Sequence, residues 1–237
     1  MLAGSRALRY TASMCGRIVR DNLDHYSRYV QLVEPPPPDA QPRFNIAPTQ
    51  MDLIIRAHDD GRHLEESRWG LVPVWAKERR IGSRMFNARA ETLLEKTAFK
   101  GLVGSRRCVI PASGFYEWQR APDRKVPLYI YRADGAPLAL AGLHTFWRDP
   151  STDEWVTLHT IVTCGPNEFM APIHNRMPVV LGGDALQLWL DPSVSEPAAV
   201  LPVLQPCQDD WLTFHAVSSL VNSVRNEGHQ LVEPIDK

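Results

Sequence analysis

The sequence lacks long apolar runs, and no stretch approaches the roughly 18 uninterrupted apolar residues that a membrane-spanning helix needs. Its four cysteines, Cys15, Cys108, Cys164 and Cys207, are far apart and form no CxxC pair. That spacing argues against a zinc site and against a disulfide framework. There is also no internal repeat and no linker long enough to divide two domains. We therefore expect a soluble, cytoplasmic, single-domain protein with reduced thiols and no metal.

Net charge is nearly absent as well, at −1 for the whole chain at pH 7. The total therefore gives no reason to expect a nucleic acid, a membrane surface or an acidic ligand as partner. The distribution is uneven, however. Residues 56–107 carry twelve Lys and Arg against seven Asp and Glu, whereas residues 182–237 carry two against eight. A protein with almost no net charge can still have one basic face when its charges are distributed in this way.

Proline is abundant, with 20 residues, which favours a loop-rich fold with interrupted strands. Residue patterns predict strands at Met51–Arg56, Glu66–Leu71, Cys108–Gln119, Leu128–Arg132, Leu138–Phe146, Trp155–Thr163, Pro178–Leu181 and Thr213–Val217. Helices are predicted from an Asn22 cap to the Pro35–Pro38 run, with the apolar face Leu23, Tyr26, Val30 and Val33, and at Thr92–Phe99, Asn167–Ala171 and Asp184–Trp189, the last capped by Asp184. Because strands outnumber helices without regular alternation, we expect an α+β fold with a mainly antiparallel, β-barrel-like core and flanking helices.

Residues 1–13 do not resemble part of this fold. They contain Arg6 and Arg9 without any acid, and their longest apolar run is three residues, too short for a secretory signal. An organellar transit peptide is one interpretation. The favoured interpretation is a start at Met14, whose removal would leave Cys15 as the N-terminal residue. We expect a single domain over residues 14–237, with residues 1–13 as a mis-assigned start or a removed leader.

Cys15 in an N-terminal position would carry a thiol and an α-amine of pKa about 7.7–8.0, so part of the amine is neutral near pH 7. Such a 1,2-aminothiol condenses with an aldehyde to an imine, and the thiol then closes a five-membered thiazolidine. The alternative is a small buried hydrophobic side chain, which is the commoner role of a cysteine.

Two further residues are candidates for proton transfer. Glu117 lies between aromatic residues and shares a strand face with Phe115, an environment that raises a carboxyl pKa and suits general acid–base catalysis. His174 lies in a loop, where a neutral imidazole can relay protons. Spacing alone favours the ordinary alternatives, a glutamate at the rim of a strand and a loop histidine.

Candidate nucleic-acid ligands gather in the basic stretch. In an extended segment Asn87 and Arg89 share one face, with an amide that can orient a carbonyl and a guanidinium that can bind phosphate. Aromatic and cationic side chains interleave at Trp69, Trp75, Arg79, Arg80 and Arg84, as in a platform for single-stranded nucleic acid. A turn asparagine, core tryptophans and a solvated charged loop explain the same residues, so each signal is weak alone.

Dispersed motifs nevertheless agree with one family. They are Met14-Cys15-Gly16-Arg17, Arg43–Pro48, Arg68–Pro73, Phe86–Thr92, Arg107–Trp118, His174–Pro178, and His215–Ser218 with Val221-Asn222. In this order they resemble the SRAP family, the SOS-response-associated peptidase-like proteins that crosslink to abasic sites in single-stranded DNA. The resemblance covers nearly everything after Met14 and reverses the ordinary interpretations above. The chain departs from the pattern in its extension before Met14, because the family works from an exposed N-terminal cysteine.

The resemblance implies a barrel-like core with a positively charged cleft for single-stranded DNA, and it implies no metal or organic cofactor. Cys15 would be the nucleophile, and Asn87 would hold the N-terminal residue and the sugar in register. Glu117 would act as general acid and base, helping to open the sugar ring, and His174 would assist proton transfer, including reversal of the crosslink. Arg17, Arg89 and Arg84 would hold phosphates, while Trp75 would stack near the lesion.

The implied function is that of a DNA-damage enzyme that senses an abasic site, forms a covalent DNA–protein crosslink and shields the lesion. We expect a monomer that joins the nucleoid when bound to DNA. Two alternatives stay open. One is a cysteine peptidase of the N-terminal-nucleophile type, cleaving itself or other proteins, although no oxyanion-loop signature is recognisable. The other is a non-catalytic single-stranded DNA-binding module, with no covalent product and a steep dependence on salt.

Overall fold

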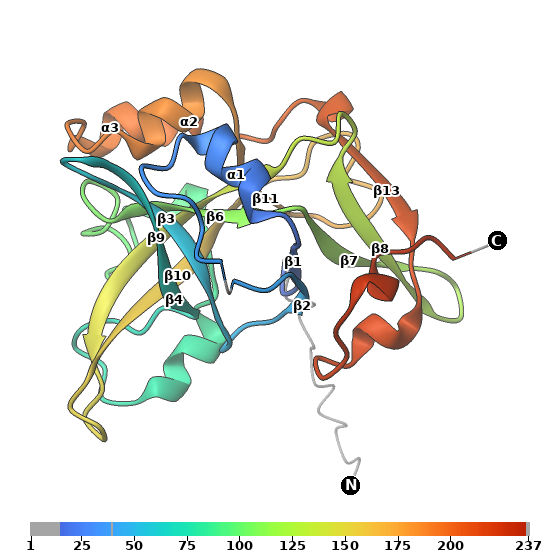
Figure 1. The fold of residues 1–237 in the computed structure, drawn as a ribbon, viewed down its shortest axis with the longest axis horizontal. Helices are drawn as coiled ribbons and strands as arrows, with labels where there is room; N and C mark the ends of the chain where they lie inside the picture. The colour runs from blue at the N-terminus through green and yellow to red at the C-terminus, as the bar shows by residue number, and fades with distance from the viewer. Residues whose placement is uncertain (1–14, 39, 236–237) are drawn as a thin grey trace, which may run out of the picture.

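The computed structural model describes residues 15–38 and 40–235. Five of its strands form a barrel: β3 (Met51–His58), β4 (Gly61–Trp69), β6 (Arg107–Ala112), β9 (Leu138–Arg148) and β10 (Trp155–Cys164). They follow one another in the order β10-β4-β3-β6-β9, and a further pairing of β9 with β10 closes the ring (Figure 1). Neighbouring strands are antiparallel except β4 and β10, which are parallel.

A second, antiparallel sheet lies beside the barrel (Figure 1). Its strands are β13 (Leu212–Ala216), β8 (Lys125–Arg132), β7 (Gly114–Arg120), β1 (Ile18–Arg20) and β2 (Arg43–Ile46), in that order. The expectation of one strand over Cys108–Gln119 is wrong, because β6 belongs to the barrel and β7 to this sheet, with Ser113 between them. The expected α+β class with a mainly antiparallel, barrel-like core is confirmed.

Short elements complete the fold. Three short strands extend the barrel sheet: β5 (Asn87–Arg89), β11 (Met177–Pro178) and β12 (Val180–Leu181). The helices α1 (Leu23–Val30), α2 (Gly183–Leu190) and α3 (Pro197–Val200) flank the sheets (Figure 1). The 3₁₀ helices, all of six residues or fewer, are η1 (Arg79–Arg84), η2 (Ala90–Thr92), η3 (Leu201–Val203), η4 (Asp209–Trp211), η5 (Ser219–Asn222) and η6 (His229–Leu231).

Helix α1 forms as its sequence predicts at its start but ends earlier. The Asn22 side chain caps it by accepting a hydrogen bond from the backbone N–H of His25, and its inward face is buried. The helix ends at Gln31, which has a left-handed φ of 57°. The proline run therefore does not end it, and Val33 lies outside the helix with 51% of its surface exposed.

The other helix predictions need correction. Over Thr92–Phe99 the chain forms turns after η2, so that Leu93 and Phe99 reach the core without a helix. Asn167–Ala171 is also a set of turns in which the Asn167 side chain accepts from the N–H of Met170 at 2.9 Å. Helix α2 is confirmed, but it begins after Gly182, and Asp184 lies in its first turn instead of capping it.

A buried ion pair joins the two sheets. Arg20 of β1 donates from Nε to Asp52 Oδ1 of β3 at 2.9 Å, and the two residues are only 5% and 3% exposed. Burial raises the pKa of Asp52, although the neighbouring Arg20 acts in the opposite direction. This contact ties β1, which precedes the helix α1, to the barrel wall.

Two buried histidines are neighbours on adjacent strands of the barrel. His144 of β9 pairs in register with His159 of β10, and the exposed fractions are 2% and 0%. A ring nitrogen of His159, Nδ1, lies 3.0 Å from Ser67 Oγ. Burial lowers the pKa of both imidazoles to about 3, and Arg56 and Arg106 add to the effect on His144. Both rings are therefore neutral in the folded protein at neutral pH.

We expect the protein to lose stability in mild acid because of these two rings. The unfolded chain takes up protons at an ordinary histidine pKa of about 6.5, whereas the folded protein resists them until about pH 3, so stability falls as the pH drops through this window. The loss is about 1 to 3 kcal/mol per pH unit for the two histidines together. Urea unfolding at pH 7 and pH 5 measures it, and His159→Gln should flatten the difference. Replacing the exposed His229 by Gln is the control, and an equal pH dependence in both variants would refute this assignment.

Candidate functional site

The candidate site begins where β1 meets β7. Ile18 and Val19 of β1 pair with Phe115 and Gly114 of β7, and the N–H of Tyr116 donates to the carbonyl of Arg17 at 2.9 Å. This register extends the pairing toward Cys15. The backbone N–H of Cys15 donates to Glu117 Oε1 at 2.6 Å, although 102 positions separate the two residues.

Burial raises the pKa of both the Cys15 thiol and the Glu117 carboxyl. Cys15 is 0% and Glu117 5% exposed. Burial raises the pKa of Glu117 to about 7, although the N–H groups of Cys15 and Trp118 act against the shift. Burial, and secondarily the charge of Glu117, raises the pKa of the Cys15 thiol well above its usual range. The carboxyl can therefore give or take a proton near neutral pH, whereas the thiol stays protonated until a base removes its proton.

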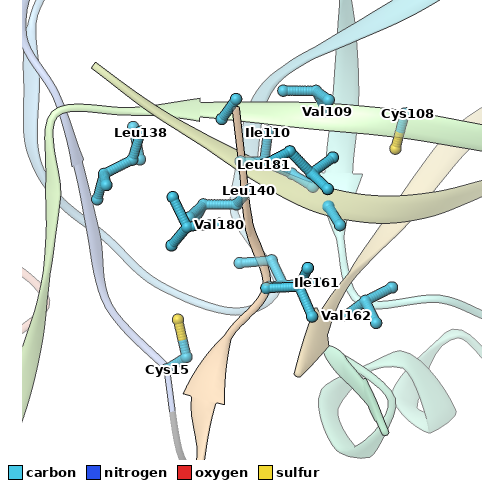
Figure 2. Close-up of a cluster of buried hydrophobic side chains, with 14 of the residues drawn as sticks. Cys15, Cys108, Val109, Ile110, Leu138, Leu140, Ile161, Val162, Val180 and Leu181 are labelled. Atoms are coloured by element: carbon cyan, nitrogen blue, oxygen red, sulfur yellow. The ribbon is translucent and has the colours of Figure 1, made fainter. Parts of the chain in front are cut away.

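Cys15 presents its two reactive groups in different directions. Its backbone nitrogen faces Glu117, while its side chain points into the cluster of buried hydrophobic residues that includes Val180 and Ile161 (Figure 2). Its φ of 47° lies in the left-handed region, which non-glycine residues seldom adopt. A backbone held in this region at a candidate nucleophile is consistent with a functional constraint.

Asn87 and His174 come from motifs that meet at the end of β10. Strand β5, which begins at Asn87, pairs in parallel with Ile161–Thr163 of β10. Strand β11, which follows the His174 loop, pairs antiparallel with the end of the same strand. Ala88 of β5 packs into the same buried cluster as Cys15. The structure thus groups three of the predicted catalytic motifs around one strand end and one core.

The His174 loop is held by its own arginine. The N–H of Arg176 donates to His174 Nδ1 at 3.1 Å. The Arg176 guanidinium donates to both carboxylate oxygens of Glu91, at 2.7 and 2.9 Å, and to the carbonyl of Thr163 at 2.6 Å. The hydrogen bonds from Arg176 hold the pKa of Glu91 below its usual range. Both charged residues lie inside motifs of the sequence, but no local pattern pairs them, so neither was predicted to have a role.

A groove of about 500 Å³ opens beside Asn87. Its lining consists of Arg84, Met85, Asn87, Arg89, Thr92, Lys96, Thr97, Ala98 and Phe99, and we refer to it as the basic groove. Three cations and no acid line it, so it favours an anionic ligand. It brings together Asn87, Arg84 and Arg89 from the sequence analysis, which missed Lys96. The position of Lys96 in the basic stretch was the available signal.

Trp75 lies on a loop that is closed at its base. The N–H of Leu71 donates to the carbonyl of Met85 at 3.1 Å, and Gly70, with a φ of +125°, approaches Gly82 so closely that an added Cβ would lie 2.5 Å from the Gly82 carbonyl oxygen. Trp75 is 65% exposed on this loop. Trp69, which the sequence analysis grouped with it, is instead fully buried, with Nε1 donating to the Phe86 carbonyl.

The Arg17 side chain has partners within the protein. Its guanidinium donates to Asn45 Oδ1 and to the Val221 carbonyl, both at 2.6 Å, and lies over the ring of Trp118. Burial lowers the pKa of Arg17. These contacts fasten β1 to the η5 turn near the C-terminal end of the described chain. A phosphate contact by Arg17 stays a prediction.

Residues 15–38 and 40–235 lack two features that would indicate other kinds of site. No helix there has the length and apolar character needed to cross a membrane. No cluster of three or more His, Cys, Asp or Glu side chains in the same ranges is arranged to hold a metal ion.

Comparison with known sequences adds to this geometry. Residues 14–224 match the family described as SOS response associated peptidase (SRAP). The chain is 40% identical over 228 residues to the abasic site processing protein YoqW of Bacillus subtilis, covering 93% of this chain and 99% of that one. It is 30% identical over 230 residues to the abasic site processing protein YedK of Escherichia coli, covering 94% and 100%. The abasic site processing protein HMCES of Gallus gallus is 33% identical, covering 83% and 67%.

Solved structures share the fold. A protein from Bacteroides thetaiotaomicron superposes with a TM-score of 0.81 at 24% identity and covers 93% of this chain and 100% of its own. A protein from Bordetella bronchiseptica has a TM-score of 0.75 at 26% identity, with coverage of 86% and 100%.

Proposed function

The chain belongs to the SOS response associated peptidase family, and from this premise we propose that it senses abasic sites in DNA and crosslinks to them through Cys15. The observation that carries the proposal is the hydrogen bond of 2.6 Å between the Cys15 nitrogen and the buried carboxyl of Glu117. An abasic sugar in its ring-opened form offers an aldehyde, which is the electrophile that a 1,2-aminothiol traps. The names of the relatives, abasic site processing proteins, support the same substrate.

The proposed reaction balances with the loss of one water. The α-amine of Cys15 adds to the sugar aldehyde, and its proton passes to the oxygen to give a carbinolamine. Departure of that hydroxyl group as water leaves an imine. The Cys15 sulfur then adds to the imine carbon while its proton passes to the imine nitrogen, closing the thiazolidine. Attack by the amine comes first because the buried thiol holds its proton, whereas an α-amine is partly neutral near pH 7.

Glu117 carries the protons in this proposal. Its carboxyl lies within hydrogen-bond distance of the nitrogen that reacts. A pKa of about 7 lets Glu117 donate a proton to the departing hydroxyl group and later accept the proton of the thiol. Asn87 orients the sugar and the N-terminal residue through its amide. His174 assists proton transfer, including reversal of the crosslink. The grouping of both motifs at the end of β10 supports these roles.

The DNA strand would follow the basic groove. Arg84 and Arg89 would bind phosphates there, and the exposed Trp75 would stack on a base near the lesion. The substrate is a single strand, because stacking on Trp75 needs an unpaired base. We further propose that the protein acts as a monomer in the cytoplasm and at the nucleoid.

The active form must begin at Cys15. While a peptide bond occupies the Cys15 nitrogen, that atom cannot form an imine, so residues 1–14 have to be absent or removed. We propose that the domain begins with the motif at Met14, which coincides with the start of the family match. A start at Met14 followed by loss of that methionine is sufficient, and self-cleavage before Cys15 is the alternative route.

Intact-mass spectrometry tests the proposal. The protein, produced from its own gene context, is incubated with a single-stranded oligonucleotide that carries one abasic site. We expect a protein beginning at Cys15 and an adduct whose mass is the sum of both partners less one water. The same oligonucleotide with an intact base is the control. A protein beginning at Cys15 that forms no adduct, or that cleaves a peptide library without DNA, contradicts the proposal.

We expect Glu117→Gln to slow adduct formation about 100-fold or more, the usual contribution of a positioned acid–base group. The amide keeps the hydrogen bond to the Cys15 nitrogen but cannot transfer a proton. In the unmodified protein the dehydration step needs the protonated carboxyl, so the corresponding limb of the rate profile falls as the pH rises through about 7. That limb should vanish in the variant. Single-turnover rates from pH 5.5 to 9 measure both effects, and an unchanged profile would remove Glu117 from the mechanism.

A further inference from the structure

We propose that Arg176 is a positioning residue for His174, and that its ion pair with Glu91 sets the proton-transfer geometry of the site. This inference rests on the proposed function and deepens it. It gives a role to two charged residues that no part of the reaction above uses. It also assigns Arg176, which lies within a motif next to the basic groove, to the protein framework and not to the DNA.

Both terminal amino groups of the Arg176 guanidinium are engaged, whereas its Nε is buried with no hydrogen-bond partner among the described residues. The guanidinium forms a bidentate pair with Glu91, at 2.7 and 2.9 Å, and it also donates to the carbonyl and the hydroxyl of Thr163, at 2.6 and 3.1 Å. The Arg176 side chain is only 18% exposed, whereas that of Glu91 is 52% exposed. Planar, two-point pairing of this kind fixes orientation as well as distance. A phosphate would have to displace a carboxylate that already neutralises this charge.

Arg176 also contacts the His174 imidazole directly. The backbone N–H of Arg176 donates to His174 Nδ1 at 3.1 Å. A nitrogen that accepts a hydrogen bond carries no proton, so the neutral ring holds its proton on Nε2. Protonation of Nδ1 would set two donors against each other, the ring N–H and the backbone N–H of Arg176. The loop therefore selects a neutral imidazole that offers an N–H at Nε2.

The ion pair also links two motifs that lie on either side of β10. Glu91 follows Asn87 in one motif, and Arg176 follows His174 in another, and the two motifs lie on opposite sides of β10. The ion pair spans the strand end and is anchored on it at Thr163. It therefore fixes the separation between the amide of Asn87 and the ring of His174. Arg89 provides the contrast, because it also pairs in register with Thr163 but is exposed and lines the basic groove.

The test compares Arg176→Gln with the matched variant Arg89→Gln in single-turnover crosslinking of an abasic oligonucleotide. We expect Arg176→Gln to lower the rate at saturating DNA about 10- to 100-fold, the cost of misplacing a catalytic group by about an ångström. The DNA concentration for half-saturation should stay the same. Arg89→Gln should instead raise that concentration and lower the salt slope of binding by about 1. If Arg176→Gln shifts half-saturation and salt slope as Arg89→Gln does, Arg176 binds phosphate and the proposal is wrong.

A charge exchange and a spectroscopic readout separate positioning from a general loss of structure. The double variant Glu91→Arg with Arg176→Glu should recover a large part of the rate that each single variant loses. Ring ¹⁵N shifts of His174 should report the Nε2–H tautomer in the unmodified protein and a tautomer mixture in Arg176→Gln. Unchanged ¹⁵N shifts in that variant would overturn the proposal. If the unmodified protein forms no adduct, the proposed function fails, while the ¹⁵N measurement still decides the role of Arg176.

Discussion

In protein that begins at residue 15, replacing Cys15 by Ala abolishes the heat-stable adduct with abasic DNA. The amine remains and still forms an imine, but no sulfur is available to close the ring, and an imine hydrolyses when heated. The expected loss is complete within detection, because the nitrogen of each other described cysteine is held in a peptide bond, so its thiol has no neighbouring free amine with which to close a thiazolidine. Denaturing electrophoresis after heating, together with intact-mass spectrometry, measures it.

Two companion variants sharpen this result. Cys15→Ser keeps an amine and a hydroxyl, so an adduct should appear only after borohydride reduction of the imine. Cys207→Ala removes a partly exposed thiol and should leave the adduct yield unchanged. A heat-stable adduct in Cys15→Ala without reduction would show that another group supplies the nucleophile, and the thiazolidine mechanism would be abandoned.

Replacing Asp52 by Ala should cost about 3 to 5 kcal/mol of unfolding free energy, because it leaves the charge of Arg20 buried without a partner. Arg20 is 5% exposed and has no direct access to water for its charge. The contact also joins β1 to the barrel, so the strand that carries the Cys15 motif should loosen with it. Urea unfolding at pH 7 measures the loss.

Two control variants separate the effect of an unpaired buried charge in Asp52→Ala from the loss of an ion pair as such. Glu78→Ala breaks the exposed pair with Arg80 and should change stability by less than about 1 kcal/mol. The double variant Arg20→Met with Asp52→Leu should be close to the unmodified protein, because in the native pair Asp52 Oδ2 and Arg20 Nη1 are buried with no hydrogen-bond partner among the described residues. A loss in the double variant as large as in Asp52→Ala would mean that the charges themselves stabilise the fold.

Sequence patterns predicted the parts of the site that depend on local periodicity. Glu117 sits next to aromatic residues in a strand, and alternation alone placed it on the face of Phe115; in the structure both residues are buried. Spacing alone favoured a glutamate at the rim of the strand, whereas in the structure burial raises the pKa of Glu117, as the aromatic neighbours also allowed. Asn22 was predicted as the cap of α1 from its residue type and position, and it is the cap.

Contacts between residues far apart in the sequence could not be predicted from local patterns. One hydrogen bond of Arg17 reaches Val221, 204 positions away, and no local pattern encodes such a partner. The pairs Arg20–Asp52 and Arg176–Glu91 were missed for the same reason. The phosphate contact that the family resemblance implies for Arg17 stays a prediction. Trp69 and Trp75 belong to the same basic stretch, yet the first lies in a barrel strand and the second on the loop between Leu71 and Met85. Only the fold separates a core tryptophan from an exposed one.

The contact between Arg17 and Val221 also has a consequence for the order of synthesis. A ribosome releases β1 first, but the guanidinium of Arg17 finds its carbonyl partner only when the η5 turn has emerged. The carboxyl of Glu117 likewise arrives 102 residues after Cys15. Contacts this distant in sequence form late and slowly. A nascent chain therefore exposes an unassembled cysteine, and the pair of Cys15 with Glu117 cannot form until β7 has emerged.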